Sequence, residues 1–80
     1  MNLRTYMKTI SSAVEDYIKS KPFLVSALTQ GIINLTSLAR IMNNDIKSVM
    51  NKDVRNGAIV MALKRLSSSL NVVQGIGKID

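Results

Sequence analysis

The strongest constraint on the fold is an apolar stripe within residues 34–50, NLTSLARIMNNDIKSVM. Residues three and four apart share one face of an α-helix. The apolar side chains follow that spacing, at Leu35, Leu38, Ala39, Met42, Ile46, Val49 and Met50. Asn34 precedes the stripe and belongs to the residue types favoured at a helix N-cap. The segment is therefore predicted to be helical, with one face against a core.

A polar interruption at Asn43-Asn44 leaves two interpretations of this segment. Either one helix runs through residues 35–50, or two short helices, 35–42 and 46–50, meet at a corner as in a helix-turn-helix. We favour the corner, because short polar side chains compete with the helix backbone for hydrogen bonds. Asn also tolerates the left-handed conformation that a corner needs. On this interpretation Val49 fills the core from the second helix.

Two further helices are predicted before this segment. The first spans residues 9–19, where Ser12 and Glu15 have the spacing of a capping box. The second begins at Pro22, which is favoured in the first helical position, and ends at Gly31, a residue suited to a left-handed cap. The two residues that follow, Ile32 and Ile33, are an extended step and one candidate strand.

The last helix is predicted over residues 54–70, with Asp53 as its cap. Its centre, residues 58–63, is apolar on every side, which is typical of a central buried helix. Gly57 costs such a helix about 1 kcal/mol relative to alanine, so we expect another backbone to approach it closely. Ser67 to Ser69 are expected to fray the end of the helix. Three methionines are interpreted as core filler: Met42, Met50 and Met61.

The predicted fold is one all-α domain, a small bundle of four or five short helices of helix-turn-helix type. Residues 1–8 form an arm and residues 9–70 the helical core. The tail, residues 71–80, contains β-branched residues and two glycines. It is predicted to form either a short β-wing or a linker. Because aromatic residues make up only 4% of the chain, the core must be aliphatic.

Composition argues against an enzyme. The chain has no Cys and no His, which removes disulfides, thiolate or imidazole metal ligands and the usual general base. The acidic residues are scattered, and no Gly-rich phosphate loop is present. We therefore expect no catalytic residues, no metal, no cofactor and no small-molecule substrate.

The net charge of +6 suits a polyanion such as nucleic acid or acidic lipid headgroups, although ordinary solubility explains it equally well. The longest apolar run, residues 58–63, falls far short of the roughly 18 residues of a membrane span. The first eight residues, MNLRTYMK, lack a continuous apolar signal region. A cytoplasmic protein without a membrane partner is the expectation.

Polar and basic side chains around the predicted corner are candidates for contacts with DNA phosphates and base edges. The first three in the list below lie on the polar side of residues 46–51, and the next two flank the corner. The last one opens the final helix, where backbone N–H groups also favour phosphate. These candidates are Lys47, Ser48, Asn51, Arg40, Lys52 and Arg55. The alternative interpretation is a solvated helix face.

Parts of the chain also resemble a small prokaryotic family of uncharacterised proteins. The matching words are KPFL at 21–24, GIIN at 31–34, LAR at 38–40 and, most specifically, GAIVMALKRL at 57–66. In that family a helical, winged-helix-like segment precedes an ACT-like regulatory domain, and some members are labelled as aspartate-kinase-related. The resemblance covers somewhat over half the chain and implies a winged-helix-like fold. It carries over no catalytic residues, and it suggests a fragment that ends where the ACT-like part would begin.

Two functions follow as hypotheses. The first is a DNA-binding module of a transcriptional regulator, dimeric and acting on double-stranded DNA. The second is a non-enzymatic helical interaction or dimerisation module, the amino-terminal part of a regulatory protein. Basic residues gathered on one face favour the first, whereas basic residues spread around a large apolar patch favour the second.

Overall fold

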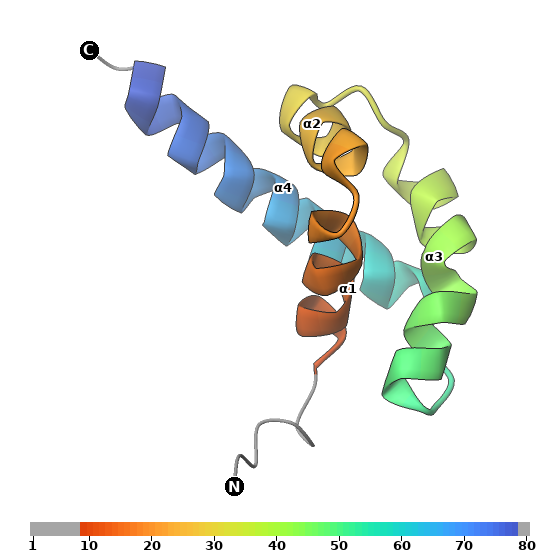
Figure 1. The fold of residues 1–80 in the computed structure, drawn as a ribbon. Helices are drawn as coiled ribbons and strands as arrows, with labels where there is room; N and C mark the ends of the chain where they lie inside the picture. The colour runs from red at the N-terminus through yellow and green to blue at the C-terminus, as the bar shows by residue number, and fades with distance from the viewer. Residues whose placement is uncertain (1–8, 79–80) are drawn as a thin grey trace, which may run out of the picture.

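Four helices make up the computed structural model, which describes the backbone of residues 9–78 and the side chains of residues 9–70 (Figure 1). They are α1 (Ile10–Lys19), α2 (Pro22–Gln30), α3 (Leu35–Met50) and α4 (Asn56–Lys78). The described residues contain no strand, which confirms the all-α prediction. The long helix α4 packs against each of the other three, while α2 and α3 meet α1 and α4 but not each other.

The first two helices are set by local signals. Thr9 is the N-cap of α1, and its hydroxyl accepts a hydrogen bond from the Ser12 amide at 3.0 Å. The predicted capping box at Ser12 and Glu15 is therefore wrong, because Ser12 already lies in the first turn. The predicted bounds of α2 are confirmed, with Pro22 in its first turn and Gly31 at its end with a φ of 68°.

The step between α2 and α3 is a turn, and the candidate strand at Ile32-Ile33 is not formed. The Ile32 amide bonds back to the Ala27 carbonyl, which ties the turn to the end of α2. The Asn34 side chain accepts from the Ser37 amide at 3.0 Å, which confirms Asn34 as the cap of α3. These two hydrogen bonds hold the ends of the turn at α2 and α3, and only Ile33 lies between the bonded residues.

The favoured break at Asn43-Asn44 is wrong, and the alternative of one helix over residues 35–50 is confirmed. Asn43 does not compete with its own helix, because its side-chain amide bonds to residues near the start of α4. The left-handed residue is Asn51, with a φ of 57°, at the true end of α3. Val49 lies outside the core with 54% of its surface exposed, contrary to its predicted role.

The last helix begins later and ends later than predicted. It starts at Asn56, and Asp53 is an exposed residue of the preceding loop rather than its cap. The serines at 67–69 do not end it, because the helix continues through them to Lys78. The Ser67 hydroxyl donates to the Leu28 carbonyl at 3.2 Å, which links α4 to α2. The predicted β-wing is also wrong, because residues 71–78 continue the helix. The predicted arm, residues 1–8, and residues 79–80 lie outside the described part of the chain.

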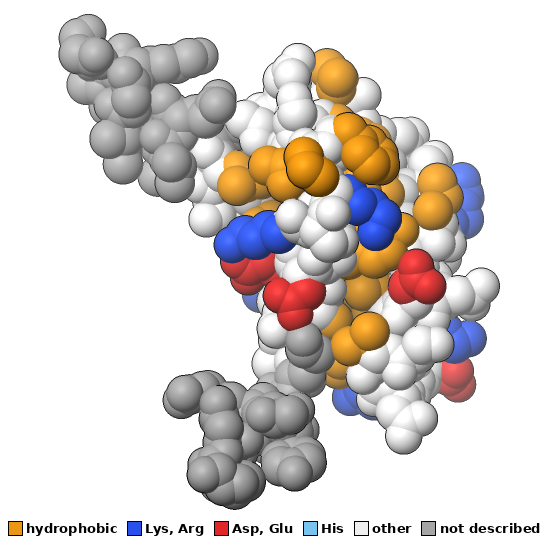
Figure 2. Space-filling view, viewed as in Figure 1, with side chains coloured by type: hydrophobic (Ala, Val, Ile, Leu, Met, Phe, Trp, Pro, Cys, Tyr) orange, Lys and Arg blue, Asp and Glu red, His pale blue; other side chains and the backbone are white. Residues whose placement is uncertain are grey.

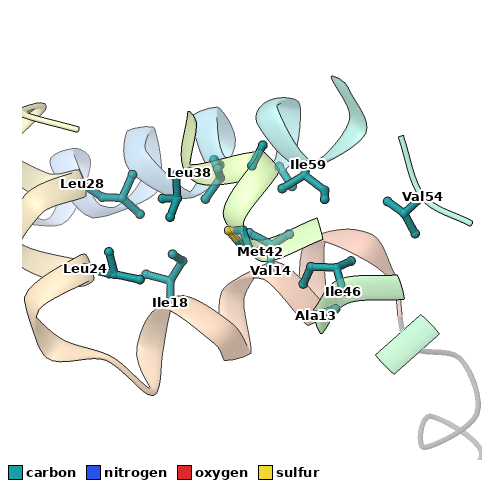
Figure 3. Packing of buried hydrophobic residues seen from close by; sticks show 13 residues of the cluster. Ala13, Val14, Ile18, Leu24, Leu28, Leu38, Met42, Ile46, Val54 and Ile59 are labelled. Carbon is teal, nitrogen blue, oxygen red and sulfur yellow. The ribbon is translucent and has the colours of Figure 1, made fainter. Parts of the chain in front are cut away.

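The core is aliphatic, as the composition indicates. Figure 3 shows its side chains pointing into the space enclosed by the helices. Burying a side chain of this kind contributes roughly 1.5–3 kcal/mol. The largest fully buried side chains come from all four helices: Ile18, Leu28, Met42, Ile46, Ile59, Leu63 and Val14.

Helix α4 is central but not buried on every side. Ile59 and Leu63 face the core, whereas Met61 is 53% exposed, so the prediction of Met61 as core filler is wrong. Met42 is confirmed as a core residue, and Met50 packs partly buried against the cluster. The predicted close approach at Gly57 is also wrong, because a Cβ built there has no neighbour within 4 Å. No contact within the described residues explains a glycine at this exposed position.

Gly31 and Gly57 should therefore respond in opposite directions to substitution by alanine. Gly57→Ala is expected to raise the free energy of unfolding by about 0.5 kcal/mol, because alanine restricts the unfolded chain and meets open space. Gly31→Ala should lower it by about 1 kcal/mol, because the backbone there is left-handed. Urea unfolding followed by circular dichroism measures both. A loss of stability in Gly57→Ala would contradict the assignment of an open position.

Candidate nucleic-acid interface

The α3–α4 junction is held by the side chain of Asn43, from the middle of α3. Its Nδ2 donates to the Val54 carbonyl at 3.0 Å and to the Asn56 Oδ1 at 2.8 Å. Val54 itself is buried at the edge of the core. These contacts fix the loop of residues 51–55 and the first residue of α4 against the centre of α3.

Basic side chains surround this junction. Arg40 and Lys47 lie one turn before and one turn after Asn43 on α3, so they flank it on the same side of the helix. Arg55 is exposed and directly precedes Asn56, the residue to which Asn43 is bonded. Lys52 is exposed in the connecting loop. We call this region the junction surface and define it by Arg40, Asn43, Asn44, Lys47, Ser48, Asn51, Lys52, Arg55 and Asn56.

A shallow depression brings together four of the six predicted contact residues. Its lining comes from the last turns of α3 and from the loop: Asn44, Lys47, Ser48, Asn51, Lys52 and Asp53. Arg40 lies one turn before Asn44 on the outward face of α3, next to this depression rather than in it. Arg55 follows two residues after Asp53, at the start of α4. All six predicted residues therefore belong to one continuous region of the surface.

The charge of the junction surface is predominantly positive. Four of the eight basic residues in the range 9–70 lie there, and the acid that lines the same depression is Asp53. The Lys47 Nζ is 3.7 Å from the Asp53 Oδ1, but the Asp53 side chain is fully exposed, so solvent screens the pair. The Lys47 ammonium therefore stays available to a second, multiply charged partner.

Backbone dipoles at the junction favour an anion near α4. The Lys47 carbonyl, in the last turn of α3, accepts from the Asn51 amide at 2.7 Å and the Lys52 amide at 3.4 Å, which reduces its exposed negative character. At the start of α4 the Arg55 carbonyl accepts hydrogen bonds from the Ala58 and Ile59 amides, which are the first backbone bonds of that helix. The earlier N–H groups of a helix have no acceptor within it and form its positive end.

The contact between Asn43 and Asn56, which organises this surface, was not predicted from the sequence. The signal was present, because Asn43 is polar and sits close to the buried stripe of α3, but it was interpreted as a helix break. The remaining described basic residues lie elsewhere. Lys19 pairs with Glu15 at 2.6 Å, Lys21 stacks over the Tyr17 ring at 4.0 Å, and Arg65 lines a depression between α1 and α4.

Comparisons with known proteins gave no match to the chain among family models, curated proteins or solved structures. Within the described residues, no group of three or more acidic, Cys or His side chains is placed to hold a metal ion. None of the described helices combines enough length and apolar character to cross a bilayer.

The contribution of the Asn43 hydrogen bonds to stability can be measured with Asn44, the next residue in α3, as a matched control. Asn43→Ala should lower the free energy of unfolding by about 1–2 kcal/mol relative to Asn44→Ala, because only Asn43 bridges α3 to the loop and α4. Both substitutions replace asparagine by alanine inside the same helix, so the difference in helix propensity cancels. Urea unfolding of the two variants measures the difference. Equal stability would show that the two hydrogen bonds contribute nothing net.

Proposed function

We propose that this chain is a non-enzymatic DNA-binding module, which acts in the cytoplasm as part of a transcriptional regulator. The observation that supports this most strongly is the grouping of Arg40, Lys47, Lys52 and Arg55 around the α3–α4 junction. Phosphate neutralisation by Lys and Arg supplies most of the affinity of such modules. A continuous surface of this kind fits one stretch of duplex backbone.

The proposed helix-turn-helix consists of α3, the loop of residues 51–55 and α4. The two helices pack against each other, and α4 leads away from the loop behind α1 (Figure 1). In a helix-turn-helix the second helix presents its first residues to the major groove. Here these are Asn56 and Gly57, both exposed. The open space at Gly57 allows a base edge or phosphate to approach the backbone of α4.

The uncharged members of the junction surface complete the proposed interface. Asn44 and Ser48 are exposed on the outward side of α3, and Asn51 is exposed directly after its end. All three carry donors and acceptors suited to base edges or phosphate oxygens. The proposal uses no wing, since residues 71–78 are helical.

A second candidate function is a helical interaction module, supported by large apolar side chains on the surface. The exposed ones are Phe23, Ile32, Ile41, Val49 and Met61. Folded domains place such side chains on the surface singly, so only a contiguous group suggests a partner. This second function does not compete for the junction surface, which contains none of the five.

A salt titration of binding to mixed-sequence duplex DNA tests the proposal. If the four basic residues engage phosphates, a log–log plot of the association constant against salt should have a slope of about −3 to −4. The double variant Lys47→Gln/Lys52→Gln should flatten the slope by about two units, because it removes two phosphate contacts. Fluorescence anisotropy with a labelled duplex is a suitable measurement.

The control is a double variant that removes two positive charges located outside the junction surface. Lys19→Gln/Arg65→Gln lowers the net charge by the same amount as the first double variant. It should leave the slope within about half a unit of the unmodified chain. Equal slopes for the two double variants would indicate attraction by net charge alone. Absence of binding at low salt would exclude the DNA-binding function.

A further inference from the structure

An apolar groove runs between α1 and α3, on the opposite side of α3 from the junction surface. It has a volume of about 230 Å³. Its lining residues are Ala13, Asp16, Tyr17, Asp45, Ile46 and Val49. Figure 2 shows hydrophobic side chains in this seam and acidic side chains beside it. Ile41, one turn before Asp45 on α3, extends the apolar surface with 70% of its side chain exposed.

The charge of the groove is unlike that of the rest of the chain. Asp16 and Asp45 contribute two of the four acidic residues in the range 9–70, and no basic residue lines the groove. Asp45 is exposed and gives the α3 side of the groove a negative charge beside its apolar floor. Its complement is a basic residue next to an exposed hydrophobic side chain.

The same face carries that complement. Lys21 lies over the Tyr17 ring, 4.0 Å from its centroid, and Tyr17 lines the groove, so the ammonium sits at the edge of the groove nearest α2. Phe23, two residues further along, is 70% exposed in the first turn of α2. Each molecule therefore presents both an acidic, apolar groove and a projecting pair of basic and aromatic side chains.

We propose that this face binds a second copy of the chain in a two-fold symmetric dimer. In such an interface residue i contacts residue j, and residue j contacts residue i. A two-fold axis between Lys21 and Asp45 brings each Lys21 over the other copy's Asp45. It also directs each Phe23 toward the other copy's Val49. These contacts form twice, once on each side of the axis, and together they cover the exposed side chains of Phe23 and Val49.

The dimer leaves the basic flank of α3 open in both copies. Positions 41, 45 and 49 follow one flank of α3, whereas positions 40, 43 and 47 follow the other, with the buried stripe between them. Two junction surfaces related by a two-fold axis are the arrangement with which helix-turn-helix dimers bind paired half-sites. The proposed dimer is independent of the proposed DNA binding, because self-association of the chain is measured in the absence of DNA.

Sedimentation equilibrium of the full chain over a range of concentrations tests the dimer. The expected species has twice the 8.8 kDa mass of one chain. Val49→Lys should raise the dissociation constant by about tenfold or more, because it places a charge in the apolar part of the interface. Met61→Lys is the matched control, since Met61 is equally exposed, at 53%, but lies on α4 outside the groove. It should leave the dissociation constant unchanged.

A charge exchange tests the pairing within the dimer. Asp45→Lys and Lys21→Asp should each raise the dissociation constant by about tenfold, and the double variant should recover most of the loss, because the exchange restores opposite charges. Circular dichroism verifies that each variant retains its helices. A monomer at all concentrations would overturn the proposal. Equal weakening by Val49→Lys and Met61→Lys, or no recovery in the double variant, would overturn this choice of face.

Discussion

The arrangement of α3 and α4 depends on one side-chain amide. Asn43 sits partly buried in the middle of α3 and donates to both the Val54 carbonyl and the Asn56 side chain. A loop carbonyl close to the core needs a hydrogen-bond partner, because leaving a buried polar group unpaired is costly. Asn43 supplies that partner and thereby fixes where α4 begins. The basic junction surface is positioned by the resulting packing of α3 and α4.

Helix α3 separates these two surfaces. Its buried stripe, from Leu38 to Ile46, packs against α1 and α4, so each flank of the helix borders a different neighbour. One flank borders the start of α4 and is basic. The other borders α1 and carries Ile41, Asp45 and Val49, two apolar residues and one aspartate. Because an α-helix repeats every 3.6 residues, the two flanks come from interleaved positions in one short segment.

The sequence predicts the local features well, and the candidate site in part. Asn34, Pro22 and Gly31 set helix ends through hydrogen bonds or backbone angles involving close neighbours in the chain, so their roles can be inferred from sequence. The six predicted contact residues do fall in one surface region, because four of them lie within a few residues of one another along the chain. The organising role of Asn43 was not predicted, because its partners are 11 and 13 residues away.

The sequence by itself determined the helical class, the aliphatic core and the net positive charge. These follow from spacing and composition, which need no knowledge of distant contacts. The tertiary structure decided that α3 is continuous, that Val49 and Met61 are exposed and that residues 71–78 are helical. The continuity of α3 and the exposure of Val49 and Met61 depend on what lies opposite a side chain after folding. A polar residue need not break a helix when its side chain bonds to another element, as Asn43 does with α4 and its preceding loop.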